Sequence, residues 1–451
     1  MLRWVSWEAT LLGRLLMVTS ELLDEEIFMS PASSFDLMGY KPEGDKKNSD
    51  FFQEFLPKVY ERRVSSGVDE LLSSMAAVMI QVDPGDGINY LEELTIMGPY
   101  RFHSAHVDAT HKVYVLKNSC KRNTPILIVF EPLAHDYMDD LVRLNLLYPM
   151  SRQKPHARYI GEIFWSSDVK ATRDALESQF IRFYDEGESP NGFFFNPHMA
   201  FTYPSDFTGN KVGYWDAEKP ELDTLNLGEK LTLTDEEKAR LDKADQWATD
   251  SGVMHLVMGL DHMATRILMG DREHAILEFL TLSPHYFWGA YNIGDQNSST
   301  NVTRNPKVND DKHSPAKVFT ANNVPSYLNS FDGLPMPTED FVRNYGHRMH
   351  HMAMEVKDGD DGKGEKNVDR VVGLLMNQGT KFLAHVVGEC RDTPDLKQIF
   401  SKHSQYSILI TEYVERCHHF KGFFTKQNVA ALTAAAGADE QFVHGNHGVY
   451  D

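Results

Sequence analysis

Two segments of the chain share one order of secondary-structure signals, and this internal repeat constrains the fold more than any other feature. The first runs RYIGEIFWSSDVKATRDALESQFIRF from Arg158, and the second runs HHMAMEVKD and then KNVDRVVGLLMNQGTKFLAH from His350. Each reads as a strand, an acidic loop, a helix and a second strand. A chain that repeats such a unit is expected to build modules of one design. In this alignment Tyr159 stands where His351 stands.

Strand-like runs alternate with helical stretches along both halves of the chain, which predicts an α+β fold. A length of 451 residues is too great for one ordinary core, so two domains of similar size are expected. A charged, proline-containing stretch over 216–248 is typical of a linker that leads into a solvated helix. The predicted parts are a helical extension (1–50), a first domain (51–240), a second domain (241–440) and a tail (441–451).

The charge of the chain argues against one class of partner. It has 65 acidic and 45 basic residues and a formal net charge of −20. Such a chain repels a phosphate backbone, so nucleic acid is not an expected partner. The apolar stretch over 11–18 is interrupted by Arg14 and is shorter than the roughly twenty residues that a bilayer span requires. No membrane segment is therefore expected.

The three cysteines, Cys120, Cys390 and Cys417, lie far apart in the sequence and lack the spacing of metal ligands. This pattern fits a reducing compartment better than a disulfide framework. We therefore expect no disulfide framework and a cytoplasmic protein.

Three strand-like runs in the second half each carry one side chain that can bind a metal. They are LDHMATRIL with His262, MHHMAMEV with His351 and ILITEYVER with Glu412. Because side chains alternate across a strand, each of the three can face one side of a curved sheet among apolar neighbours. Two neutral imidazoles and one carboxylate suit Fe(II) and leave about three coordination positions open on one face. The sequence thus predicts an Fe(II) centre with room for a chelating substrate and O2.

Each member of this group also has an ordinary structural explanation. A histidine inside an apolar strand, taken alone, is more often a hydrogen-bonded core residue than a metal ligand. Glu412 is more informative, because a carboxylate buried in an apolar run costs free energy unless it pairs with a cation or a metal. Arg416, four residues further on, is the candidate cation. The partner of Arg416 therefore distinguishes a core ion pair from a metal centre.

The stretch DLKQIFSKHSQYSILITEYVERCHHFKGFFTKQNVAAL from Asp395 resembles the C-terminal signature of the 4-hydroxyphenylpyruvate dioxygenases. NYGHRMHHMAMEVKD from Asn344 is similar to the strand that carries the second histidine of that family, and LDHMATRIL to the strand that carries the first. The resemblance covers roughly Met254 to Ala434. It implies the vicinal-oxygen-chelate fold, in which paired βαβββ modules form two half-open β-barrel domains and only the C-terminal one holds a metal.

The resemblance also implies roles for residues around the metal. Gln398 would lie on the pocket wall near the substrate, Phe424 would stack on its ring, and Asn329 would match an asparagine that contacts it. Val429 stands where a second aromatic residue of the closing helix is expected, and His350 stands where the family tends to have glutamine. These departures change the pocket and leave the three metal ligands intact.

The leading hypothesis is an Fe(II) dioxygenase that acts on an aromatic or related 2-oxo acid such as 4-hydroxyphenylpyruvate, with O2 as co-substrate and, by analogy with the family, a homodimer. The first alternative is an extradiol dioxygenase of the same superfamily, which uses the same ligands on a catechol. It would need an additional acid-base residue, for which His255 and Tyr413 are candidates, although strand parity points Tyr413 away from Glu412. The second alternative is a non-catalytic binding protein of the same fold.

Overall fold

The computed structural model describes residues 46–120, 124–188, 193–308, 314–324, 336–391, 393–418, 420 and 422–437, and the side chains from residue 54 onward within these ranges. Both sheets lie in one compact unit, Tyr40–Asp451. Most of the predicted N-terminal extension and all of the predicted tail lie outside the described residues. The four predicted domain boundaries therefore stay predictions.

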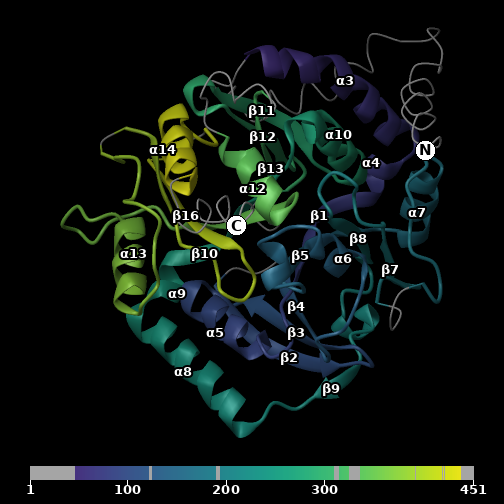
Figure 1. Cartoon of the computed structure of the whole chain (residues 1–451), viewed down its shortest axis with the longest axis horizontal. Coiled ribbons are helices and arrows are strands. Elements are labelled where there is room, and N and C mark those ends of the chain that lie inside the picture. Colours follow the sequence, from purple (N-terminus) through teal and green to yellow (C-terminus); the bar gives the residue numbers. More distant parts are fainter. Residues whose placement is uncertain are drawn as a thin grey trace. The chain divides into compact units, whose positions relative to one another are not determined.

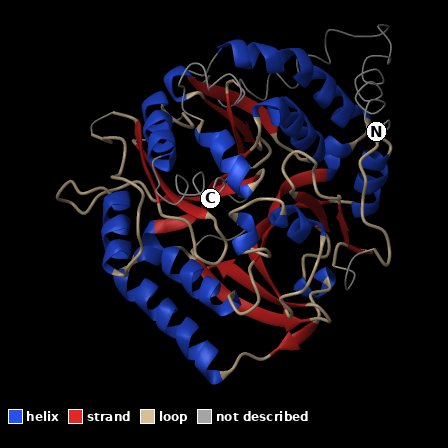
Figure 2. Cartoon of the chain, viewed as in Figure 1, coloured by secondary structure: helices blue, strands red, loops and turns tan. Residues whose placement is uncertain are grey.

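The first half of the chain forms a mixed sheet, which Figure 2 shows in red together with the second. Among the described residues its nine strands follow the order β6-β7-β8-β5-β1-β4-β3-β2-β9. Met79, Phe201 and Trp215 belong to the cluster of buried side chains that fills this half. The strands are β1 (Leu72–Gln81), β2 (Tyr100–Val107), β3 (His111–Asn118), β4 (Ile126–Pro132), β5 (Arg158–Ser166), β6 (Phe195–Asn196), β7 (Met199–Phe201), β8 (Lys211–Asp216) and β9 (Glu229–Leu231).

The second half forms a sheet of the same design. Its seven strands within the described ranges follow the order β11-β12-β13-β10-β14-β16-β15. A buried cluster that includes Phe341, Phe400 and Leu432 packs against it. The strands are β10 (Val257–Arg266), β11 (Tyr286–Ile293), β12 (Ser298–Arg304), β13 (Ala316–Asn322), β14 (Arg348–Val356), β15 (Asp395–Phe400) and β16 (Ile410–Cys417).

Helices pack against both sheets (Figure 2). They are α3 (Lys46–Ser65), α4 (Val68–Leu71), α5 (Gly87–Met97), α6 (Asp140–Leu146), α7 (Val169–Glu177), α8 (Asp235–Ser251), α9 (Val253–Leu256), α10 (Arg272–Leu282), α12 (Pro337–Tyr345), α13 (Asn367–Asn377) and α14 (Lys426–Gly437). In the part of the chain that the structure describes, no helix combines the length and apolarity needed to cross a bilayer.

The charged stretch that the sequence marks as a linker forms β9 and then α8, which runs alongside α5 (Figure 1). Thr234 and Glu237 begin α8 with a capping box, in which each side chain accepts a hydrogen bond from the backbone N–H of the other. Arg240 on α8 then pairs with Glu92 on α5 at 2.6 Å. The prediction of a helix after the linker is confirmed, whereas β9 was not predicted.

The pairing register shows that the two sheets repeat each other residue by residue. In each half the central antiparallel strand pair has the same irregularity. In the second sheet the paired residues are Ala264↔His351, Thr265↔Met349 and Arg266↔Arg348. In the first sheet they are Met79↔Gly161, Ile80↔Tyr159 and Gln81↔Arg158. Arg158 therefore corresponds to Arg348, and Gly161 corresponds to His351. The alignment of Tyr159 with His351 is wrong by two residues, because the common start of the two strands is their arginine.

The two halves are joined by hydrogen bonds that each half gives to the other. Arg158 donates to the carbonyl oxygen of His347 and Arg348 donates to that of Ala157, each at 2.7 Å. The carbonyl that receives each bond belongs to the residue directly before the other arginine. This reciprocity fixes the starts of β5 and β14 against each other.

A second reciprocal pair consists of two buried tyrosines. Tyr214 Oη donates to the carbonyl oxygen of Leu282, and Tyr413 Oη donates to that of Met97, each at 2.7 Å. Leu282 and Met97 are the last residues of α10 and α5. Each tyrosine therefore satisfies a carbonyl at a helix end in the opposite half, where the helix itself supplies no donor.

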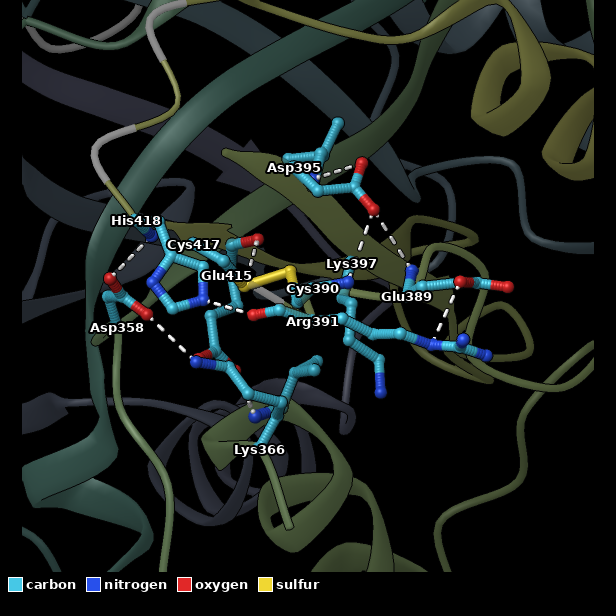
Figure 3. Close-up of a disulfide and its surroundings, with 12 residues drawn as sticks. Asp358, Lys366, Glu389, Cys390, Arg391, Asp395, Lys397, Glu415, Cys417 and His418 are labelled. Atoms are coloured by element: carbon cyan, nitrogen blue, oxygen red, sulfur yellow. Dashed lines mark hydrogen bonds and ion pairs between the residues drawn. A yellow bond between two sulfur atoms is a disulfide. The ribbon is translucent and has the colours of Figure 1, made fainter. Parts of the chain in front are cut away.

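Cys390 and Cys417 form a disulfide bond, with 27 residues of sequence separation (Figure 3). It ties the segment before β15 to the end of β16, and the β15–β16 register places Asp395 opposite Cys417. The expectation of no disulfide framework is wrong for this pair. The pairing of β15 with β16 brings Cys390 and Cys417 together, although their spacing in the sequence matches no known motif. Cys120 is the free cysteine. The cysteine argument for a reducing compartment therefore no longer holds.

We predict that Tyr214→Phe and Tyr413→Phe each lower the free energy of unfolding by about 1–3 kcal/mol, because each leaves a buried carbonyl oxygen without its donor. Urea unfolding of the purified variants measures this change. Tyr203→Phe is the matched control, since its hydroxyl donates to the exposed Glu188. Two tyrosine variants as stable as this control would contradict a role in joining the halves.

We also predict that thiol titration of the denatured, unreduced chain finds one free thiol, on Cys120. Replacing Cys390 and Cys417 together by serine should lower the free energy of unfolding by about 2–4 kcal/mol, because the closed loop no longer restricts the unfolded chain. Cys120→Ser should leave the free energy of unfolding close to that of the parent. Three titratable thiols would show that the bond is absent.

Candidate metal centre

His262, His351 and Glu412 come from three neighbouring strands, β10, β14 and β16. Ala353 on the middle strand pairs with His262 on one side and with Glu412 on the other. His351 lies two residues before Ala353, so strand alternation turns its side chain to the same face. The small side chain of Ala353 leaves space for the three larger ones to meet.

The three side chains meet at their tips. Glu412 Oε2 lies 3.0 Å from His262 Nε2 and 3.2 Å from His351 Nε2. The three atoms lie within 4.8 Å of one another. Relative exposure is 0% for His262, 7% for His351 and 1% for Glu412, so water does not solvate the group. The structure thus brings together the three side chains that the sequence singled out.

Two features of the group fit a metal better than a hydrogen-bonded core. His262 Nε2 and Glu412 Oε1 are buried and have no hydrogen-bond partner, an arrangement that costs free energy. Ligands at right angles around a first-row metal, with bonds of about 2.1 Å, are separated by about 3.0 Å. The observed separations therefore suit adjacent ligands of one ion.

Asp261 orients the first histidine. His262 Nδ1 donates to Asp261 Oδ1 at 2.7 Å, which leaves Nε2 directed at Glu412. Arg416 donates to the same oxygen of Asp261 at 3.0 Å and contacts its other oxygen as well. Among the described residues Arg416 has its ion pair with Asp261 and none with Glu412. The alternative of a core Glu412–Arg416 pair therefore fails.

Burial and charge set the protonation of the group without a metal. Burial would lower the pKa of His262, but Glu412 and Asp261 outweigh it and raise that pKa to about 9. Burial, together with the neighbouring His262 and Arg266, holds the pKa of His351 well below its usual value. Burial raises the pKa of Glu412, against the opposing effect of His262. Without a metal, His262 is therefore the protonated member of the group at neutral pH, and a divalent ion would supply more positive charge at the same place.

A cavity opens beside the group. Gln398 and Phe424 both line it, as the resemblance implied, and the Phe424 ring meets the His262 ring edge to face at 5.2 Å. Gln398 Oε1 is buried without a hydrogen-bond partner. Asn329 lies outside the described residues. The full lining is Arg266, Ser298, Thr300, Val318, Thr320, Thr338, His350, His351, Gln398, Phe400, Glu412, Phe424, Val429, Leu432 and Thr433.

Arg266 is the functional candidate that the sequence reading missed. It lines the cavity, is 6% exposed, and donates to the carbonyl oxygen of Pro337 at 3.0 Å. No carboxylate of the described residues forms an ion pair with it. Burial lowers its pKa to about 9, so it is still a cation at neutral pH. Arg266 lies four residues after His262, so strand alternation places both side chains on the same face of the strand. This spacing could have identified Arg266 as a residue of the site.

A second group of potential ligands, Asp358, Glu415 and Cys417, is not a metal centre. Cys417 is bonded to Cys390, and Lys366 pairs with Asp358 at 2.9 Å and with Glu415 at 3.1 Å (Figure 3). The lysine already pairs with both carboxylates there, and the sulfur of a disulfide has no thiolate form.

The first half of the chain offers no ligands at the equivalent positions. The shared register matches His262 to Ala77, His351 to Gly161 and Glu412 to Gly213. A Cβ atom on Gly161 would lie 1.9 Å from the carbonyl oxygen of Lys211, and one on Gly213 would lie 2.3 Å from the ring of Phe201. Two of the three positions therefore admit no side chain.

We predict that Asp261→Asn weakens binding of Co²⁺ or Fe²⁺ by about 10–100-fold, because the amide no longer holds His262 with a negative charge. Anaerobic calorimetry measures the affinity. Asp358→Asn is the control and should bind metal like the parent. Unchanged affinity in Asp261→Asn, with the parent's thermal stability, would argue that Asp261 plays no part in orienting a ligand.

No family model matches the sequence, and no curated protein matches it. Among solved structures, the chain is similar to a mutant of 4-hydroxymandelate synthase from Streptomyces coelicolor, with a TM-score of 0.55, 16% sequence identity, and coverage of 82% of this chain and 99% of that chain. A xylose isomerase-like TIM barrel/4-hydroxyphenylpyruvate dioxygenase fusion protein matches with a TM-score of 0.49 and 11% identity, over 82% of this chain and 53% of that chain.

The first of these matches covers both repeated sheets. The expected α+β fold of paired modules is confirmed. The chain therefore has the vicinal-oxygen-chelate fold seen in 4-hydroxymandelate synthase, and its C-terminal half-barrel holds His262, His351 and Glu412.

Proposed function

We propose that the protein is an Fe(II)-dependent dioxygenase that acts on an aromatic or related 2-oxo acid such as 4-hydroxyphenylpyruvate, by oxidative decarboxylation and hydroxylation. The observation that carries the proposal is the convergence of His262, His351 and Glu412 on the wall of a cavity that also holds Arg266. The shared fold supports it, because the named product of the similar synthase is an aromatic acid.

The ligand set decides which metal and which reaction class fit the site. Two imidazoles and one carboxylate would hold Fe(II) and leave its remaining positions open toward the cavity. When bound, Fe(II) would activate O2 and would coordinate a chelating oxo acid. The protein's own contribution is to fix three donor atoms among buried neighbours, which keeps water away from them.

Arg266 indicates the charge of the substrate. Two neutral imidazoles and one carboxylate reduce the charge of a divalent ion to +1, and the guanidinium of Arg266 adds a second positive charge to the same cavity. A buried cation without a carboxylate partner favours an anionic ligand. The carboxylate of a 2-oxo acid meets this requirement, whereas a neutral catechol does not.

Gln398 and Phe424 account for the aromatic part of the substrate. Gln398 Oε1 can accept a hydrogen bond from a phenolic hydroxyl, since no hydrogen bond reaches it in the structure. Phe424 supplies a ring on one side, and Val429 supplies only an aliphatic surface. The aromatic ring of the substrate is therefore held less tightly than it would be between two rings, and smaller 2-oxo acids also fit this proposal.

The extradiol alternative loses both of its candidates for the acid-base residue. Tyr413 donates its hydroxyl hydrogen to Met97, in the other half of the chain, and so lies outside the cavity. His255 lies on α9 and does not line the cavity.

A homodimer and a cytoplasmic location remain predictions from the sequence.

We predict that the purified chain with Fe(II) consumes O2 and releases CO2 with 4-hydroxyphenylpyruvate or a close relative, in equal amounts. Glu412→Ala should abolish both activity and stoichiometric iron, whereas Glu415→Gln, on the same strand and outside the cavity, should keep them. Catechol turnover without CO2 would favour the extradiol reading. A folded protein that binds no iron, cobalt or manganese would leave only the binding-protein reading.

We also predict that Arg266→Met lowers kcat/KM by about 10–150-fold, because a charge-assisted hydrogen bond of about 1.5–3 kcal/mol to the substrate is lost. Most of the loss should fall on KM, and Arg266→Lys should restore part of it. Steady-state kinetics at saturating O2 measures both constants. An unchanged KM in Arg266→Met would remove the argument for an anionic substrate.

A further inference from the structure

The first half of the chain contains a cavity of its own. Its walls combine aromatic side chains with charged ones. The lining is Gln81, Asp108, His111, Phe130, Tyr137, Asp139, Leu141, Ile160, Phe193, Phe194 and Lys211.

This cavity corresponds in position to the one beside the candidate metal centre. The register of the two sheets matches positions that line both cavities, namely Gln81 with Arg266, His111 with Ser298, Phe130 with Thr320, and Ile160 with His350. The first half therefore has a cavity at the equivalent place, while Ala77, Gly161 and Gly213 stand where the second half has its candidate metal ligands. A cavity lined by aromatic side chains together with a few charged groups is a candidate binding site for a small molecule.

Lys211 is the one cation in the described lining. It is 3% exposed, its ammonium donates to Tyr184 Oη, and it lies 4.5 Å and 4.4 Å from the ring centroids of Tyr184 and Phe194. It forms no ion pair with a carboxylate of the described residues. Burial lowers its pKa to about 8, against the nearby Asp139 and Asp140, so the ammonium is still the main form at neutral pH. A buried ammonium favours a carboxylate partner.

Two carboxylates and a histidine add further polar groups to the lining. Asp108 Oδ1 accepts from the backbone N–H of Thr110 and His111 at 2.7 Å, and Asp139 Oδ1 accepts from that of Val142 at 2.7 Å. These bonds leave the second oxygen of each carboxylate without a donor among the described residues. His111 is 7% exposed, and its Nε2 is buried without a hydrogen-bond partner.

We propose that this cavity binds a small aromatic molecule that carries both a carboxylate and an ammonium group, the chemistry of a free aromatic α-amino acid. Lys211 binds its carboxylate, Asp108 and Asp139 bind its ammonium, and the rings of Phe130 and Phe193, which meet edge to face, form an apolar wall beside its ring. A simple aromatic carboxylate would leave both aspartates facing its negative charge, and a simple amine would leave Lys211 unpaired. A zwitterion satisfies both signs.

Calorimetric titration of the full-length chain with L-phenylalanine tests the proposal. Lys211→Met should weaken binding at least 10-fold. Asp139→Asn should weaken it several-fold, and because asparagine also caps helices, this variant keeps α6 intact. Phenylacetate and phenethylamine, which each carry one of the two charged groups, should both bind more weakly than L-phenylalanine.

Arg266→Met is the matched control, because it removes the cation from the other cavity, and it should bind L-phenylalanine like the parent. Binding lost in Arg266→Met and kept in Lys211→Met would place the amino acid beside the metal centre and overturn the proposal. Absence of measurable binding at millimolar L-phenylalanine, or tighter binding of phenylacetate, would overturn it as well. If Lys211→Met does not fold, Asp139→Asn and the two single-charge ligands decide the outcome.

Discussion

The reciprocal hydrogen bonds between the two halves determine where the chemical groups lie. Arg348 donates to Ala157 at the start of β14, and His351 follows it by three residues on the same strand. Tyr413 donates to Met97, and its neighbour Glu412 points to the opposite face of β16. The strands that carry two of the three ligand side chains are therefore held by the interface between the halves. Rigid placement of this kind is what a metal centre requires of its scaffold.

The charges around the His-His-Glu group form a graded series from the surface inward. Arg416, 22% exposed at its side chain, pairs with Asp261, which in turn accepts from His262. Asp261 thus has a partner for both of its oxygens, whereas Glu412 Oε1 has no hydrogen-bond partner. Among the carboxylates of this series, Glu412 is therefore the one that a bound cation would stabilise most.

Sequence reasoning located the three ligand side chains because a polar residue inside an apolar strand is costly and therefore visible. It missed Arg266, since an arginine at the end of an apolar run also suits a surface position. It missed the disulfide, because the pairing of β15 with β16 leaves no trace in the spacing of Cys390 and Cys417. The misplacement of Tyr159 has the same origin, since strand register is a property of the partner strand as much as of the sequence.

The glycines of the first half make its divergence from the second hard to reverse. If a single unit was once duplicated to give both halves, the copy with Gly161 and Gly213 has since let the Lys211 backbone and the Phe201 ring occupy the space where ligand side chains would stand. One substitution no longer restores a ligand, because the neighbours would have to withdraw first. Under that history, single substitutions could not restore the metal ligands of this half, and its cavity would be free to change toward binding other molecules.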